Sequence, residues 1–262
     1  MMSQEDSIYQ QLRSHLAYLN LTATAEALPA RLDTARAAKT GHTEFPEALL
    51  RIEVEATEQR RWEGRMRFAN FPAPWRIDDF DFGAQPGIDE ALIRELATCN
   101  YLDDATNLLF IGPPGVGKTM LAIALGHAAV DAGHRVYYTT AADLAARCRR
   151  AALEGRWAAT MRFFNGPGVL IVDELGYLPM PSEDAAALFQ VIARRYLKGS
   201  IILTTNLGVA SWGDIFTDTT IAAAMLDRLL HKSVVISIDG DSYRLRSHQA
   251  RARQRHPKGD IS

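Results

Sequence analysis

Eight consecutive residues have the composition and spacing of a phosphate-binding loop. Residues 112–119 read Gly-Pro-Pro-Gly-Val-Gly-Lys-Thr and match the pattern G-x-x-x-x-G-K-[ST]. Glycines let the backbone turn successive N–H groups toward a phosphate, and a helix beginning near Lys118 would add its dipole. In this pattern Lys118 reaches the β- and γ-phosphates, and Thr119 ligates Mg²⁺. The predicted nucleotide contacts are Gly112, Pro113, Pro114, Gly115, Val116, Gly117, Lys118, Thr119 and Met120.

A second set of polar residues follows two other apolar segments. Asp173 and Glu174 come directly after residues 169–172, and Asn206 follows residues 201–205. Because the carboxyl ends of strands in an open α/β sheet face the ligand crevice, we expect these side chains near the bound phosphates. Asp173 would hold Mg²⁺ through water, Glu174 would polarise the attacking water, and Asn206 would orient it. The simpler alternatives are that Asp173 caps a turn and that Asn206 forms one.

These two sets predict a protein that binds ATP with Mg²⁺ and hydrolyses it. Lys118, Glu174 and Asn206 are the candidate catalytic residues, and Thr119 and Asp173 are the candidate metal ligands. A Gly/Pro-rich turn without a ligand is the alternative interpretation of the loop. It is disfavoured because an apolar strand precedes the loop and a helix follows it, as the pattern requires.

The elements that must position these residues alternate between helix and strand from Ile88 onward. Strands are predicted over residues 107–111, 135–139, 169–172, 200–205 and 234–238, and helices over residues 88–99, 118–132, 142–164, 183–197 and 221–230. Continuous apolar strands that alternate with helices are typical of a parallel sheet covered on both faces. We therefore predict an α/β fold for this part of the chain.

The segment before it has a different pattern. Residues 1–69 contain helical spacings and no strand pattern, with a break near residues 40–42, and predict a small all-helical domain. Residues 70–87 include Phe-Pro-Ala-Pro-Trp, which cannot continue a helix, and predict a connector that lies against the next domain. The predicted ATPase domain covers residues 88–248, and residues 249–262 form a basic tail.

Composition limits the function further. The 262 residues are 47% apolar and carry a net charge of −2, so no overall basic field indicates nucleic acid, although a local basic patch remains compatible with it. The two cysteines lack metal-ligand spacing and suit a reducing compartment. The polar, acidic N-terminus is unlike a signal peptide, and no apolar run reaches the ~20 residues of a membrane span. We expect a cytoplasmic protein without a membrane partner.

Four stretches give the sequence a specific resemblance. Residues 112–119, 169–179 (VLIVDELGYLP), 189–216 (ending SWGDIF) and 225–246 (MLDRLLH to SYRLR) resemble the IstB/DnaC-like helper ATPases of the AAA+ class. The resemblance covers nearly the whole chain. It implies an AAA+ P-loop core with a helical N-terminal domain that contacts a partner. The helical lid common in this class would be absent or vestigial, because only a short tail follows Ile238.

The resemblance also implies roles for matching positions. Residues 112–119 correspond to Walker A, Asp173 and Glu174 to Walker B, and Asn206 to sensor 1. Arg228 stands where such proteins carry an arginine finger, which reaches the γ-phosphate held by a neighbour and implies a homo-oligomer. A surface salt bridge is its alternative. Arg244 would contact nucleotide as sensor 2, which the missing lid puts in question.

Assembly on DNA is a further implication of the resemblance. Residues 135–162 contain six arginines and only two acidic residues. Arg147, Arg149, Arg150 and Arg156 are the candidate contacts to duplex phosphates, without reading of base sequence. A solvated helix face explains each of them equally well. The basic tail is either a second electrostatic contact or simply disordered.

Three functions remain open at this point. The resemblance favours a transposition helper that oligomerises on duplex DNA, recruits or activates a cognate transposase, and uses hydrolysis as an assembly and disassembly switch. A replicative helicase loader with the same core is the alternative. A small-molecule kinase is disfavoured, because the sequence shows neither an acceptor pocket nor a mobile lid.

Overall fold

The computed structural model describes residues 4–176, 180–216, 219–240, 242 and 243. The chain divides into two compact units between Gly64 and Arg65, a division that lies inside a long helix. Arg244 and the tail over residues 249–262, both singled out from the sequence, lie outside the described residues. No helix of the described residues is long and apolar enough to cross a membrane.

The first unit is built from helices α1 (Gln4–Tyr18), α2 (Thr22–Ala38) and the start of α3 (Glu44–Ala69). Leu16, Leu28 and Leu49 form its small apolar core. Glu53 is buried there and accepts hydrogen bonds from the backbone N–H of Thr24 at 2.9 Å and from Arg60 at 2.8 Å. The bond from Thr24 and then the bond from Arg60 lower the pKa of the Glu53 carboxyl, which stays ionised.

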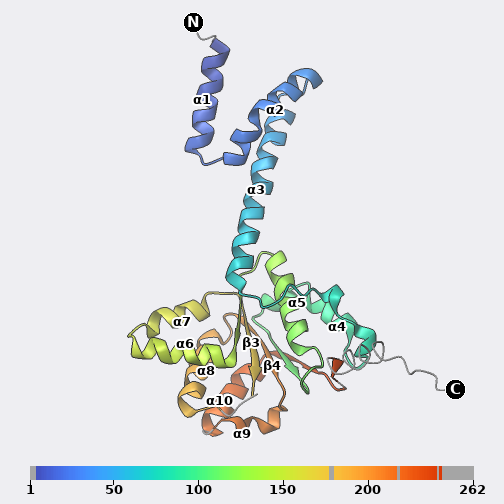
Figure 1. The fold of residues 1–262 in the computed structure, drawn as a ribbon, viewed down its shortest axis with the longest axis vertical. Coiled ribbons are helices and arrows are strands. Elements are labelled where there is room, and N and C mark those ends of the chain that lie inside the picture. The colour runs from blue at the N-terminus through green and yellow to red at the C-terminus, as the bar shows by residue number, and fades with distance from the viewer. Residues whose placement is uncertain (1–3, 177–179, 217–218, 241, 244–262) are drawn as a thin grey trace, which may run out of the picture. The chain divides into compact units, whose positions relative to one another are not determined.

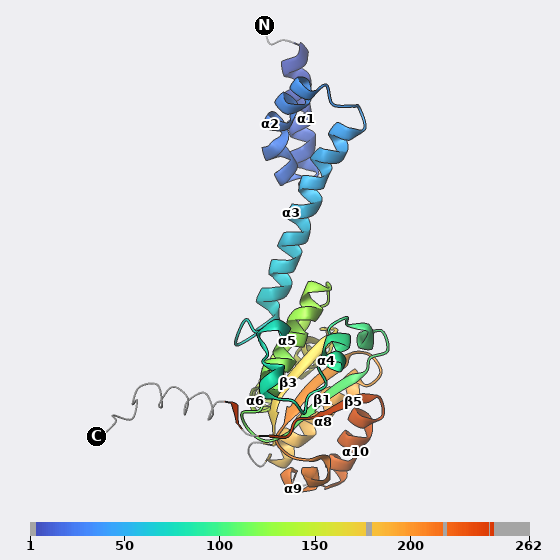
Figure 2. The same cartoon turned by 90° about the vertical axis from the view of Figure 1, so that its right-hand side faces the viewer.

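The second unit is organised by a five-stranded parallel sheet, seen in Figure 2. Its strands lie in the order β2-β3-β4-β1-β5. They span β1 Asn107–Ile111, β2 Val136–Thr140, β3 Val169–Leu175, β4 Ser200–Thr205 and β5 Ser233–Ser237. Residues 169–172 of β3 and 201–203 of β4 are apolar and buried, as the sequence predicted for strands covered on both faces.

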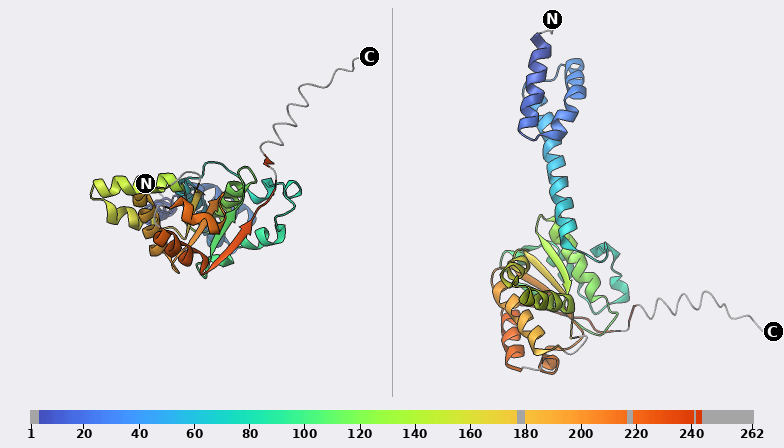
Figure 3. Two further views of the ribbon diagram at one scale, coloured as in Figure 1. Left: turned by 90° about the horizontal axis from the view of Figure 1, so that it is seen from below. Right: turned by 60° about the vertical axis from the view of Figure 1, so that its left-hand side comes forward.

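Helices cover both faces of this sheet (Figure 1, Figure 3). They span α4 Glu90–Leu96, α5 Lys118–Asp131, α6 Ala141–Leu153, α7 Trp157–Asn165, α8 Ser182–Arg195, α9 Trp212–Ile215 and α10 Thr219–Leu230. α5 packs on the central strands from one side, whereas on the other side α8 packs against both α6 and α10. The predicted α/β architecture is confirmed.

Several predicted elements differ in extent from the observed ones. The helix expected over residues 88–99 is shorter and spans Glu90–Leu96. The single helix expected over residues 142–164 is two helices, α6 and α7, because Gly155 adopts a left-handed φ of 67° after α6 ends. β3 continues beyond Val172 to Leu175, so that Asp173 and Glu174 belong to the strand itself.

A buried arginine fixes the entry ends of β3 and β4. Arg195 of α8 is 1% exposed and donates hydrogen bonds to the carbonyls of Phe164, Pro167, Gly168 and Ser200 at 2.8–3.0 Å. Burial lowers the pKa of its guanidinium to about 10. The four carbonyls satisfy most of its donors and hold the two strands in register at the end away from Asp173.

Candidate nucleotide-binding site

The phosphate loop connects β1 to α5, in the context that the motif requires. Gly117 precedes α5 with a φ of 103°, which favours glycine. A Cβ at Gly112 would lie 2.0 Å from the carbonyl oxygen of Ile238, where the chain leaves β5. These two glycines are therefore required by the backbone geometry and by close packing, respectively.

Lys118 begins α5 and is buried. Its Nζ donates hydrogen bonds to the carbonyl oxygens of Gly112 at 2.7 Å and Pro113 at 2.8 Å, both within the loop. The ammonium group thus lies inside the curve of the loop, where the motif places phosphate oxygens.

Asp173 is 2% exposed and accepts hydrogen bonds from three hydroxyl groups. Thr119 donates to its Oδ1 at 2.9 Å, Thr204 donates to the same oxygen, and Tyr138 donates to Oδ2 at 2.7 Å. Burial, followed by the bond to Asp173, raises the pKa of Tyr138, so its phenol stays protonated and donates.

The pair of Asp173 and Thr119 fits Mg²⁺. A carboxylate and a hydroxyl at hydrogen-bond distance are the hard oxygen ligands that this ion takes. Across the described residues, no group of three or more His, Cys, Asp or Glu side chains could hold a metal without further ligands. Mg²⁺ commonly binds through one or two protein groups, waters and nucleotide phosphates, so one carboxylate and one hydroxyl are a sufficient protein contribution.

Glu174 adopts an unusual backbone conformation at the edge of the site. Its φ is 61°, and the pairing of β3 with β4 is irregular between Val172 and Leu175. The backbone N–H of Glu174 is satisfied by the hydroxyl of Thr204 at 3.0 Å. Glu174 is exposed to solvent.

Two cavities meet at the phosphate loop. The smaller, about 70 Å³, brings Glu174 and Asn206 together with the loop. Its lining residues are Pro114, Gly115, Lys118, Thr119, Glu174, Thr204, Thr205 and Asn206. The larger, about 340 Å³, shares Gly115, Lys118 and Thr119 with it. The convergence expected of the strand ends is therefore present.

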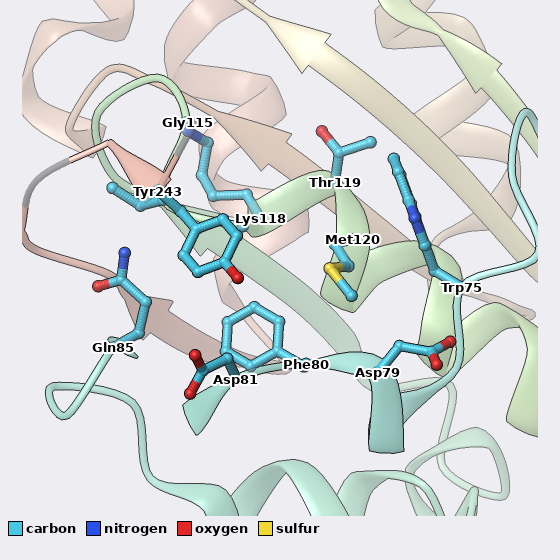
Figure 4. Close-up of a pocket in the computed structure, with 12 residues that line it drawn as sticks. Trp75, Asp79, Phe80, Asp81, Gln85, Gly115, Lys118, Thr119, Met120 and Tyr243 are labelled. Atoms are coloured by element: carbon cyan, nitrogen blue, oxygen red, sulfur yellow. The ribbon is translucent and has the colours of Figure 1, made fainter. Parts of the chain in front are cut away.

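The larger cavity is lined by aromatic residues that sequence reasoning did not assign to the site. Trp75 and Phe80 come from the connector, Tyr243 comes from the segment after β5, and Met120 lies between them (Figure 4). The backbone N–H of Tyr243 donates to the carbonyl of Gly115 at 3.0 Å. The concentration of aromatic and aspartate residues after Asn70 was the available signal, but it predicted only that the connector lies against the next domain.

Arg228 lines neither cavity in the described part of the chain. It lies in α10, where its guanidinium donates to the carbonyl of Ala224 at 2.8 Å and lies 5.0 Å from the ring centroid of Phe189. A role for Arg228 in catalysis therefore requires the site of another subunit.

The four candidate DNA-contacting arginines are exposed on α6 and at the start of α7. Arg147 lies 3.7 Å from the centroid of the Phe163 ring. Arg149 forms an ion pair with Asp184, and Arg156 forms one with Glu154. Arg150 lies in the last turn of α6. The region thus carries exposed positive charge, but intramolecular contacts already engage three of its four arginines.

The fold and the loop together define a P-loop nucleotide-binding protein of the AAA+ class. The family of IstB-like ATP binding proteins matches residues 14–251, and this chain belongs to that family. It is 43% identical over 237 residues to a protein of Geobacillus stearothermophilus named as the ATP-binding protein of insertion sequence IS5376, covering 90% of this chain and 94% of that protein.

A second relative supports this family, and two solved structures share the fold. The chain is 43% identical to the ATP-binding protein of insertion sequence IS21 from Pseudomonas aeruginosa, covering 90% of this chain and 88% of that protein. Its fold resembles AMPPCP-bound DnaA from Aquifex aeolicus, with a TM-score of 0.56, 20% identity, and coverage of 71% of this chain and 57% of that one. It also resembles DnaI, with a TM-score of 0.55, 16% identity, and coverage of 63% and 91%.

Proposed function

We propose that this chain is the ATP-driven helper of an insertion sequence, which hydrolyses ATP with Mg²⁺ and assembles on duplex DNA to recruit or activate a transposase. The observation that carries the proposal is the small cavity that Glu174 and Asn206 share with the phosphate loop. The names of the relatives, each an ATP-binding protein of an insertion sequence, support the biological setting.

Nucleotide binding would use both cavities. The phosphates would lie against the N–H groups of the loop and the start of α5, with Lys118 turning from the loop carbonyls to the β- and γ-oxygens. The larger cavity would receive the base, because Trp75, Phe80 and Tyr243 offer aromatic faces next to the loop. Ser242 and Tyr243 would then lie at the edge of the bound nucleotide.

Hydrolysis would be completed by the residues at the ends of β3 and β4. Mg²⁺, when bound by Thr119 and Asp173, would neutralise charge on the phosphate oxygens. Glu174 would accept a proton from the attacking water, and Asn206 would orient that water by hydrogen bonding. Arg228 from an adjacent subunit would stabilise the charge of the transition state, so turnover would require an oligomer.

Duplex DNA would be bound through its phosphates. Arg147 and Arg150 are exposed on one helix and would lose no carboxylate partner that the structure shows for them, whereas Arg149 and Arg156 would first have to leave Asp184 and Glu154. Contacts of this kind make binding strongly dependent on salt and largely independent of base sequence.

The test is the rate of ATP hydrolysis by the full chain, measured against protein concentration and with duplex or single-stranded DNA. We expect the rate per subunit to rise with protein concentration and with duplex DNA. Binding to the transposase encoded with this protein, measured by pull-down against a replicative helicase, tests the partner. ATP turnover that depends only on an added small-molecule phosphate acceptor would overturn the proposal. Capture of the helicase but not of the transposase would also overturn it.

A further inference from the structure

The carboxylate of Asp173 is held from three directions. The hydroxyls that contact it come from the first turn of α5 (Thr119), from β2 (Tyr138) and from β4 (Thr204). Asp173 is only 2% exposed, so water does not compete with these hydrogen bonds for the carboxylate. The bonds therefore decide which oxygen faces the phosphate loop. Oδ1 lies on the side of Thr119, and Oδ2 lies on the side of Tyr138.

The three donors are not equivalent. Thr119 is itself a proposed metal ligand and lines both cavities. Tyr138 lines neither of them in the described part of the chain, and the residue is only 9% exposed. Its hydroxyl therefore acts on the site only through Asp173. Thr204 lines the smaller cavity, but its hydroxyl is already engaged with the backbone of Glu174 and with Asp173.

Tyr138 is also fixed in place. It pairs with Ile171 in the parallel ladder between β2 and β3, two positions before Asp173 on the neighbouring strand. Its carbonyl accepts a hydrogen bond at 3.2 Å from the side chain of Asn70, the residue that follows α3. Because the backbone of Tyr138 is held by β3 and by the side chain of Asn70, the phenol presents its hydroxyl at a nearly constant position.

We propose that Tyr138 and Thr204 are positioning residues that hold Asp173 in the rotamer needed for Mg²⁺, with Oδ1 toward the phosphate loop. This inference rests on the proposed function, because it concerns the metal that accompanies ATP. When the metal is bound, the Thr119 hydroxyl would leave Asp173 and ligate the ion through its oxygen. Tyr138 and Thr204 would continue to hold the carboxylate. Their hydroxyls would therefore determine the Mg²⁺ concentration needed for nucleotide binding, and not the affinity for nucleotide in the absence of Mg²⁺.

The test uses the full chain, a fluorescent ATP analogue, and no DNA. Binding is titrated with Mg²⁺ at fixed nucleotide and is measured separately in EDTA. The variants are Tyr138→Phe, which removes only the hydroxyl, and Thr204→Val, with Thr204→Ser as the rescue. Tyr137→Phe is the matched control, since Tyr137 is the adjacent tyrosine of β2 and its hydroxyl contacts Arg147 rather than Asp173. Thermal unfolding without nucleotide is recorded for each protein.

We expect Tyr138→Phe and Thr204→Val to raise the Mg²⁺ concentration for half-maximal binding by about tenfold, as loss of a hydrogen bond to a charged group predicts. Affinity in EDTA should stay within about twofold, and Thr204→Ser and Tyr137→Phe should match the parent. An unchanged Mg²⁺ requirement in both variants, or an equal loss of affinity with and without Mg²⁺, would overturn the inference. If the parent itself bound no nucleotide, the proposed function would fail instead.

Discussion

Replacement of Glu174 by glutamine isolates the step that separates nucleotide binding from hydrolysis. The variant keeps the size of the side chain and removes only its ability to accept a proton. The exposed carboxylate contributes little to folding, and the left-handed backbone is held by the bond from its own N–H to Thr204, which does not involve the side chain. Structure and nucleotide affinity should therefore be retained.

The expected loss is in the rate. A positioned general base contributes about 10²–10⁴-fold, which corresponds to about 3–5 kcal/mol of transition-state stabilisation. Steady-state phosphate release should fall by that factor, while affinity for the fluorescent ATP analogue changes by less than about threefold. Release of the ATP-bound assembly from duplex DNA should slow in parallel, because hydrolysis is the proposed disassembly step.

Glu95→Gln is a suitable control, since Glu95 is an exposed glutamate of α4 away from both cavities. It should hydrolyse ATP at the parent rate. If Glu174→Gln turned over within about threefold of the parent, or left DNA as quickly, Glu174 would not be the base and the assignment of the small cavity would be wrong.

Three other outcomes follow from particular contacts. Lys118→Ala should abolish nucleotide binding and, with it, assembly on DNA, which equilibrium binding would show. Arg195→Met should lower the free energy of unfolding by about 2–4 kcal/mol in urea, because four carbonyls lose their donor while the cost of burying a charge is removed. The lowered pKa of Glu53 contributes stability above the unfolded-state pKa near 4.5, and this contribution is lost as pH falls through the lower folded-state pKa. The free energy of urea unfolding of the helical unit should therefore fall in acid, and Glu53→Gln should remove that pH dependence.

The parts of the site that the sequence predicted are local in sequence. The phosphate loop is one uninterrupted motif. Glu174 and Asn206 lie near the carboxyl ends of the neighbouring strands β3 and β4, so the topology of a parallel sheet was enough to bring them together. The continuous apolar runs of β3 and β4 predicted that these strands are buried, because such runs are typical of strands covered on both faces.

The parts that were missed depend on which segments become neighbours in three dimensions. Tyr138 reaches Asp173 only because β2 pairs with β3, and Tyr243 reaches Gly115 only because the chain after β5 returns to the loop. Neither contact can be predicted from the spacing of residues in the sequence. The break at Gly155 is different, because a glycine inside a helical stretch is itself a sign of a possible helix end.

Electron microscopy of the full chain on duplex DNA, with a slowly hydrolysed ATP analogue, would show whether the ATP site is shared between subunits. We expect an oligomer in which the guanidinium of Arg228 from one subunit lies within hydrogen-bond distance of the γ-phosphate bound beside Lys118 and Glu174 of the next. A nucleotide-bound chain that stays monomeric on DNA, or an oligomer in which Arg228 faces away from the neighbouring phosphate, would contradict it.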